Sequence, residues 1–338
     1  MIYNFNLGIG WASSGVEYAQ AYRAKLLRSI GADAKFIFTD MFPRDNIEHM
    51  TKNIGFLDSE VIWLYTFFTD CKIAPVSYTL EKLESTFSDR NYTFSRDGKT
   101  AKYVFPGSNN FYTVYMVDET SDLVHRVEMV TNGCLIRKDY FTYCRIYSEY
   151  YAPLDNQAHL YQRRFFNEDG TVAYEEITDN DVVMYQFPDR LICSKEELVG
   201  YMVQRLKLTE EDVVIIDRTT GIGQAIMENA SPARIGIVIH ADHFSEGGTD
   251  DQNILWNNYY EYSLGQFTRN YTQTVKRAAD NKRRYAPGWV HSTCLLRGFP
   301  KGAAPHLAHD FAEQSVVCYT LCRRCPENTV AAGEGKGI

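Results

Sequence analysis

The sequence predicts an α/β fold built on a parallel sheet, with an antiparallel β domain inserted within it. Near both ends of the first 262 residues, short buried-strand runs alternate with segments of helical period, which is typical of a parallel sheet covered on both faces. Between them, residues 76–188 follow a period of two, with polar turns such as Asp97-Gly98 and Asn132-Gly133. That pattern indicates an antiparallel meander.

The parallel part begins with an apolar, β-prone run at 2–7, which leads through the glycine-rich turn Gly8–Gly15 into a helical pattern at 16–30. After the inserted domain, Ser194 and Glu197 have the spacing of a capping box, which predicts a helix to about residue 207. The other elements predicted for this part are strands at 35–39, 61–67, 213–217 and 235–239 and a helix at 45–52.

Composition and charge exclude several classes of protein. Hydrophobic residues make up 45% and charged residues 23%, and no run approaches the roughly 18 apolar residues of a membrane span, so neither disorder nor a membrane-spanning protein is expected. A net charge of −8 argues against nucleic-acid binding. The first residues, MIYNFNLGIGW, carry no Lys or Arg before the apolar run, so they indicate a first strand and not a signal peptide, and we expect a cytosolic protein.

Charge and cysteine content change sharply near Ser263. The last 75 residues carry 11 Lys and Arg against 5 Asp and Glu, whereas the preceding 263 carry 24 against 38. Four of the eight cysteines lie in this last part. Such a break indicates a domain boundary or a foreign segment, so residues 263–338 are treated separately.

The glycine-rich turn Gly8–Gly15 is the first candidate for a ligand site. In an open parallel sheet, ligands bind beyond the carboxyl ends of the strands, where the N–H groups of such turns face a phosphate. The spacing differs from the dinucleotide fingerprint, and no acidic residue ends the second strand at the expected distance. Phosphate contact and a simple tight turn therefore both remain open.

A second candidate follows the last predicted strand. His240 comes directly after that strand, where it can donate a hydrogen bond or act on a proton in the ligand cleft. His240 and His243 could instead bind a metal with Asp242 or Glu246. The sequence indicates no further His or Cys of residues 1–262 that would lie at the same place. A third alternative is a histidine satisfied by the backbone of its loop.

The last part of the chain contains residue types that bind zinc, but their spacings fit no standard structural site. We therefore favour an out-of-frame or disordered segment over a zinc module, and we expect no metal site in the protein. The residues concerned are His291, Cys294, His306, His309, Cys318, Cys322 and Cys325.

Several stretches, in order over residues 1–262, make the sequence recognisable. FNLGIGWASSGVEYAQAYRAKLLR is very similar to the N-terminus of the glycosyltransferase subunits that begin O-glycosylation of serine-rich repeat adhesins in the accessory Sec system of Gram-positive bacteria. Further stretches resemble the same family: FIFTDMFPRDNIEHMTKNIGF, VIWLYTFFTD, KIAPVSYTL, LIRKDYFTYCRIYSEYYAP, LYQRRFFNEDGT, DRTTGIGQ, VIHADHFSE and ILWNNYYEY.

The resemblance implies a retaining enzyme of GT-B fold, similar to glycosyltransferase family 4, which transfers N-acetylglucosamine from UDP-GlcNAc to Ser and Thr hydroxyls of the adhesin. It implies that residues 1–75 and 189–262 form the Rossmann-like, acceptor-side half and that residues 76–188 form an extended β-sheet domain. That sheet would dock a second, glycosyltransferase-like subunit without catalytic activity. The implied location is the cytosol, with peripheral membrane association through the complex, and the implied donor is UDP-GlcNAc, with no further cofactor.

Residue by residue, the resemblance assigns His240 to catalysis near the sugar and the acceptor. It assigns Ser14 and Gly15, in SSGVE, to the turn that approaches the donor diphosphate. The remaining assignments, to the acceptor side of the cleft, are Asp217, Arg218, Gly221 and His243.

After ILWNNYYEY the resemblance ends, and the E-x7-E pattern of the donor-binding half does not occur in an apolar context. Because the break coincides with the change in charge, we expect a frameshift near codon 263, so that the donor-binding half is missing. The chain would then be a truncated transferase without activity of its own. The alternative is a non-enzymatic fragment that docks the partner or binds the acceptor.

Overall fold

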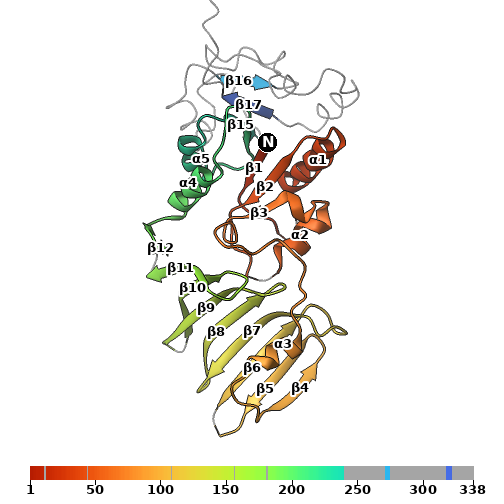
Figure 1. Cartoon of the computed structure of the whole chain (residues 1–338), viewed down its shortest axis with the longest axis vertical. Helices are drawn as coiled ribbons and strands as arrows, with labels where there is room; N and C mark the ends of the chain where they lie inside the picture. Colours follow the sequence, from red (N-terminus) through yellow and green to blue (C-terminus); the bar gives the residue numbers. More distant parts are fainter. Residues whose placement is uncertain are drawn as a thin grey trace, which may run out of the picture.

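The computed structural model describes residues 1–238, apart from 11–12, 44, 108, 156 and 180–181, together with the backbone of 239, 271–274 and 317–321. These residues form a seven-stranded sheet and a ten-stranded antiparallel sheet (Figure 1). Both the parallel sheet and the inserted antiparallel sheet of the prediction are therefore present. None of the helices in the described residues has the length and apolar composition needed to cross a bilayer.

Five strands of the first sheet are parallel, in the order β15-β14-β1-β2-β3. Two short strands extend it beyond β15, where β17 pairs antiparallel to β15 and β16 antiparallel to β17. The strands are β1 (Ile2–Asn6), β2 (Ala34–Phe38), β3 (Val61–Trp63), β14 (Val213–Ile216), β15 (Arg234–Ile239), β16 (Tyr271–Thr274) and β17 (Val317–Leu321).

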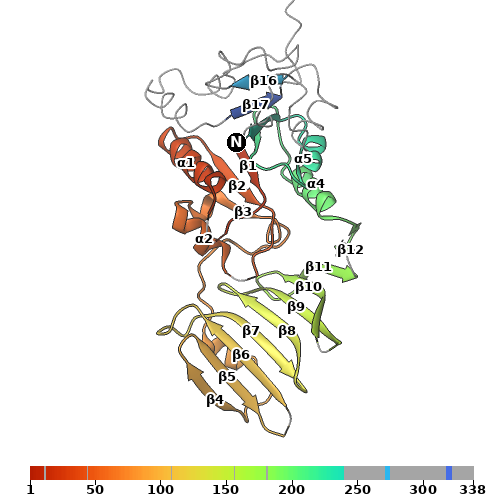
Figure 2. The same cartoon turned by 180° about the vertical axis from the view of Figure 1, so that it is seen from behind.

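Helices cover this sheet on both sides. Figures 1 and 2 show α1 (Gly15–Ser29) and α2 (Ile47–Ile54) on one side, and α4 (Lys195–Arg205) and α5 (Gly223–Asn229) on the other. The core between the layers includes Phe5, Phe36 and Ile216, which are fully buried. This arrangement confirms the α/β pattern of the sequence.

Two elements differ in length or position from their prediction. Helix α2 was predicted at 45–52 but spans Ile47–Ile54. Asn46 caps its N-terminus by accepting a hydrogen bond from the Glu48 N–H, and Gly55, with a φ of 103°, ends it. The strand expected at 61–67 ends at Trp63, because Thr66 and Phe67 fold back in a turn onto the Trp63 carbonyl. The apolar run instead buries its side chains against the extended sheet.

The extended sheet runs in sequence order from β13 at one edge to β4 at the other. Its predicted turns use residues with positive φ, including Gly98, Asn132 and Gly133. Its strands are β4 (Thr93–Asp97), β5 (Thr100–Phe105), β6 (Asn110–Met116), β7 (Val124–Thr131), β8 (Cys134–Phe141), β9 (Arg145–Leu154), β10 (Gln157–Phe166), β11 (Val172–Asp179), β12 (Val182–Gln186) and β13 (Leu191–Ile192).

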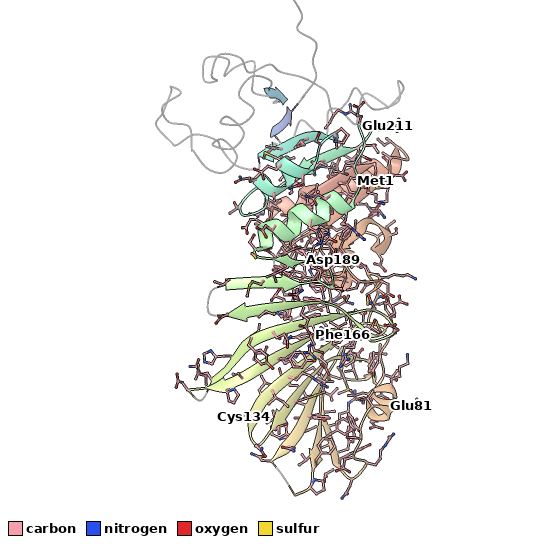
Figure 3. All side chains as sticks on the ribbon, turned by 60° about the vertical axis from the view of Figure 1, so that its left-hand side comes forward. Met1, Glu81, Cys134, Phe166, Asp189 and Glu211 are labelled. Carbon is pink, nitrogen blue, oxygen red and sulfur yellow. The ribbon has the colours of Figure 1, made fainter. Side chains whose placement is uncertain are left out.

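Two hydrophobic cores hold the extended sheet. At the end far from the α/β unit, α3 (Leu80–Ser85) covers one face, and Leu83 and Phe87 pack with the buried Tyr103. Near the α/β unit, aromatic side chains of the sheet join the main core of the molecule; Tyr65 stacks on Phe165 at 5.5 Å between ring centroids. Because this core is continuous, it holds the sheet against the α/β unit (Figure 3).

Candidate functional site

The candidate site lies at the edge of the parallel sheet where β1, β2 and β14 end. Because the strands are parallel, the loops that follow them meet at this one edge, which is where open α/β sheets bind ligands. The loops are the turn between β1 and α1, the segment that begins at Asp40 after β2, and residues 217–222 between β14 and α5.

A capping box fixes the start of α1 at this edge. The Ser14 Oγ accepts a hydrogen bond from the Val16 N–H at 3.3 Å, and the Glu17 carboxylate accepts one from the Ser14 N–H. Gly15 is the first residue of the helix, and apart from its chain neighbours and the nearby backbone of its own helix, no described heavy atom would lie within 4 Å of a Cβ placed there. Among the described residues, nothing blocks the Cβ side of Gly15, so a ligand can approach the backbone there.

Arg218 joins this helix start to the loop after β14. Its Nη2 donates to Ser14 Oγ at 3.2 Å and lies 3.9 Å from Glu17 Oε1, and its side chain is 40% exposed. Two loops that are about 200 residues apart in sequence thus form one surface. The guanidinium and the helix N-terminus together favour an anion, and the Glu17 carboxylate already compensates part of this positive charge.

Asp217, the residue before Arg218, lies beneath that surface and is fully buried. Its carboxylate accepts two hydrogen bonds from the Arg23 guanidinium, at 2.8 and 2.9 Å, and a third from Gln20 Nε2 at 2.7 Å. Arg23 also donates to Asn4 Oδ1 on β1, at 2.9 Å. These bonds fix α1 to β1 and to the end of β14, and so hold the two loops of the site.

The start of α4 closes the other side of the edge. Lys195 Nζ forms an ion pair with Asp40 Oδ1 at 2.5 Å, directly after β2. A Cβ on Gly8 would lie 3.0 Å from Asp40 Oδ2, so only glycine fits there without displacing the carboxylate. Gly221 has a φ of 72°, which also favours glycine, and a Cβ there would lie 3.6 Å from Glu196 Oε1.

Known proteins resemble this chain in sequence over most of its length. Residues 92–189 match the family model of the GtfA extended beta-sheet domain. The chain is 50% identical over 291 residues to the UDP-N-acetylglucosamine–peptide N-acetylglucosaminyltransferase GtfA subunit of Streptococcus agalactiae, which covers 84% of this chain. Over these shared residues the chain belongs to the GtfA family.

Two crystal structures agree with this assignment. A GtfA/B complex matches with a TM-score of 0.74 and 53% identity over 78% of this chain. The pneumococcal O-GlcNAc transferase GtfA in complex with UDP and GlcNAc matches with a TM-score of 0.80 and 45% identity over 86% of this chain. The chain spans 58% of the S. agalactiae subunit and 53% and 59% of these two chains, so it matches little more than half of each.

The structure brings together four of the residues predicted from the sequence. Ser14, Gly15, Arg218 and Gly221 lie at the carboxyl edge of the sheet, while the Asp217 carboxylate lies below it on Arg23. His240 and His243 lie outside the described residues, as do all the candidate zinc ligands except Cys318, whose backbone alone is described. The ligand roles of all these residues stay predictions.

Sequence reasoning missed the supports of the site. Gln20 and Arg23 lie on the buried side of α1, which packs against β1. Two polar residues on the buried face of a predicted helix indicate a buried polar partner, so the sequence did contain a signal for this support. Lys195 and Asp40 are 155 positions apart, so no local sequence pattern predicts that they pair. Among the described residues, no group of three His, Cys, Asp or Glu side chains is placed to hold a metal ion.

Proposed function

We propose that the chain supplies the acceptor-side α/β half and the extended β-sheet of a retaining GT-B enzyme, which transfers N-acetylglucosamine from UDP-GlcNAc to Ser and Thr hydroxyls of a serine-rich adhesin. The observation that carries the proposal is the shared carboxyl edge, at which the start of α1 meets Arg218. The 50% identity to a GtfA subunit over 291 residues supports it.

The edge has features suited to the donor diphosphate. The resemblance puts Arg218 on the acceptor side, but we assign it to the donor diphosphate, because it donates to Ser14 Oγ at the start of α1. Departure of UDP leaves negative charge on the β-phosphate, which the Arg218 guanidinium and the Gly15 N–H, not used by the capping bonds, can stabilise. Gly15 leaves room for the phosphate oxygens to approach the backbone. In a retaining transfer without a covalent intermediate, the acceptor hydroxyl attacks from the face that UDP leaves, so catalysis depends mainly on holding both substrates.

His240 follows β15 directly, and we assign it to the sugar and the acceptor hydroxyl, with His243 nearby on the acceptor side. We assign no metal and no cofactor besides the donor substrate. The extended sheet would dock a second, glycosyltransferase-like subunit in the cytosol, and that complex would provide any peripheral contact with the membrane. A GtfA subunit has been crystallised with such a partner in the GtfA/B complex, which supports this arrangement.

A chimaera tests the proposal on the described residues. Residues 1–239 of this chain replace the aligned segment of the S. agalactiae GtfA subunit, and transfer of radiolabelled N-acetylglucosamine to a serine-rich polypeptide is measured with that subunit's own partner. We expect labelling of the polypeptide, because the replaced segment would supply the same half of the site. Arg218→Ala in the chimaera should lower kcat/KM about tenfold, the loss expected for one charge-assisted hydrogen bond.

Arg190→Ala is the matched control, because Arg190 is a surface arginine that pairs with the exposed Asp189. It should leave transfer unchanged. A chimaera that binds its partner but labels nothing would overturn the enzymatic proposal and leave a docking fragment. An Arg218→Ala variant as active as the Arg190→Ala variant would remove Arg218 from the donor site.

A further inference from the structure

Two cysteine thiols face each other where the extended sheet meets the α/β unit. Cys71 Sγ lies 3.7 Å from Cys144 Sγ and 3.3 Å from the Phe166 carbonyl oxygen. Cys71 belongs to the segment after β3, whereas Cys144 belongs to the turn between β8 and β9, 73 residues later. The pair therefore bridges the two parts of the molecule.

Hydrogen bonds hold both segments in this position. The Lys72 N–H donates to the Tyr143 hydroxyl at 2.8 Å, so the neighbours of the two cysteines are tied to each other. Asp70 Oδ1 accepts a hydrogen bond from the Glu168 N–H at 2.6 Å, which links the same segment to the turn after β10. With the backbone fixed, rotation of the cysteine side chains is the motion that remains for bringing the sulfurs together.

Small oxidants can reach the pair. Both cysteines are half-buried, and Cys71 lines an open pocket of about 380 Å³ beside β3, together with Trp63, Phe67 and Ile73. Cys144 can donate its S–H to the Cys71 sulfur, which lowers the pKa of Cys71, although burial opposes this. The same contact and burial raise the pKa of Cys144. Because Cys71 lines the pocket and Cys144 is not among its lining residues, Cys71 is the thiol that an oxidant reaches first.

We propose that Cys71 and Cys144 form a modification site at which a hydroperoxide produces a reversible disulfide. The Cys71 thiolate attacks one peroxide oxygen, the O–O bond breaks, and the other oxygen leaves with a proton as water or an alcohol. The Cys144 sulfur then attacks the sulfenic sulfur of Cys71, the S–S bond forms, and hydroxide leaves and takes up the Cys144 proton as water. The two sulfurs lose two electrons in all, and the peroxide bond gains them.

The disulfide would tie the segment after β3 covalently to the extended sheet. It closes a loop of 73 residues, and closing a long loop reduces the conformational freedom of the unfolded chain. The oxidised chain should therefore melt several degrees higher than the reduced chain, with less freedom between the sheet and the α/β unit.

The test uses the purified full chain, reduced, freed of reductant and treated with hydrogen peroxide. Remaining thiols are blocked with N-ethylmaleimide, and non-reducing peptide mapping by mass spectrometry locates every linkage. We expect a linked peptide pair that contains Cys71 and Cys144, lost on treatment with dithiothreitol, and a higher melting temperature in the oxidised sample. Recovery of Cys71 as a free thiol or as sulfinic acid, with no linkage to Cys144, would overturn the proposal.

Serine variants provide the controls. Cys144→Ser should abolish the linkage and the rise in melting temperature, since the resolving thiol is gone. Cys134→Ser should change neither, because Cys134 begins β8, at the opposite end of that strand from the turn that contains Cys144. If the linkage formed without any rise in melting temperature, the modification site would stand. The expected loss of freedom between the extended sheet and the α/β unit would then be wrong.

Discussion

At the scale of single residues, the buried pair of Arg23 and Asp217 explains how the candidate site keeps its shape. The exposed fractions of the two side chains are 8% and 0%, and three elements meet at their hydrogen bonds. Burying two charges costs desolvation free energy, so the pair contributes less to the free energy of unfolding than its short hydrogen bonds suggest. Removing one member, however, leaves the other charge buried without its partner.

We therefore expect Asp217→Ala to lower the free energy of unfolding by about 3–5 kcal/mol, because the Arg23 guanidinium keeps its burial and loses its counter-charge. Asp217→Asn should lower it less, since the amide oxygen still accepts a hydrogen bond. Urea denaturation followed by circular dichroism measures both values.

Asp189→Ala is the control at the surface, where the carboxylate is 62% exposed and pairs with Arg190. Such pairs contribute less than about 1 kcal/mol. If Asp217→Ala destabilised the protein no more than Asp189→Ala does, the buried pair would have no structural importance.

At the scale of elements, two rows of side chains cross the extended sheet. Four aromatic residues are paired in register on successive strands: Tyr140, Tyr147, Phe165 and Tyr174. The rings of the first two stack with centroids 4.2 Å apart and those of the last two with centroids 4.5 Å apart, whereas the middle pair is tilted. This row packs against the α/β unit. The adjacent row alternates in charge, with Glu128, Lys138, Glu149, Arg163 and Glu176 paired in turn across five strands.

Within the aromatic row, two buried hydroxyl groups differ in their partners. The Tyr174 hydroxyl donates to the Tyr65 carbonyl at 2.8 Å, whereas the Tyr147 hydroxyl has no hydrogen-bond partner among the described residues. Tyr174→Phe should therefore cost about 1–2 kcal/mol, because it leaves a buried carbonyl unpaired. Tyr147→Phe should be neutral within about 0.5 kcal/mol, or stabilising, because it removes a buried group that lacks a partner.

Each of the two variants is the control for the other, because both lose one hydroxyl from a fully buried ring of the same row. Thermal and urea unfolding compare them with the parent chain. Equal losses for both variants would show that the hydroxyls contribute through packing and not through hydrogen bonding.

At the scale of the whole molecule, the sequence predicted the two-sheet architecture well, because period, turn residues and caps are local signals. The strand at 213–217 was placed within one residue, and the turn at Asn132-Gly133 was correct. Local signals failed where distant parts meet: the run 61–67 is apolar because it packs on the extended sheet, and no local pattern linked Lys195 to Asp40. The site was only partly predictable, since Arg23 and Gln20 act through Asp217, nearly 200 residues away.

The extended sheet projects from the α/β unit, and away from that unit α3 covers only one of its faces (Figures 1 and 2). On the opposite face, Val104 pairs with Phe111, and Phe111 with Val130, across three strands. Val104 is 39% exposed. We take this strip, with Lys102 lying over the Phe111 ring, as the contact surface to test.

If the extended sheet docks the second subunit through this strip, Val104→Glu should weaken the complex, because binding would then bury an unpaired carboxylate. Co-purification of the full chain with a tagged GtfB-type subunit measures the effect, and we expect at least a tenfold loss of affinity. Leu57→Glu is the matched control, since Leu57 is 51% exposed but belongs to the α/β unit. If both variants or neither lost binding, the strip would have no specific part in docking the second subunit.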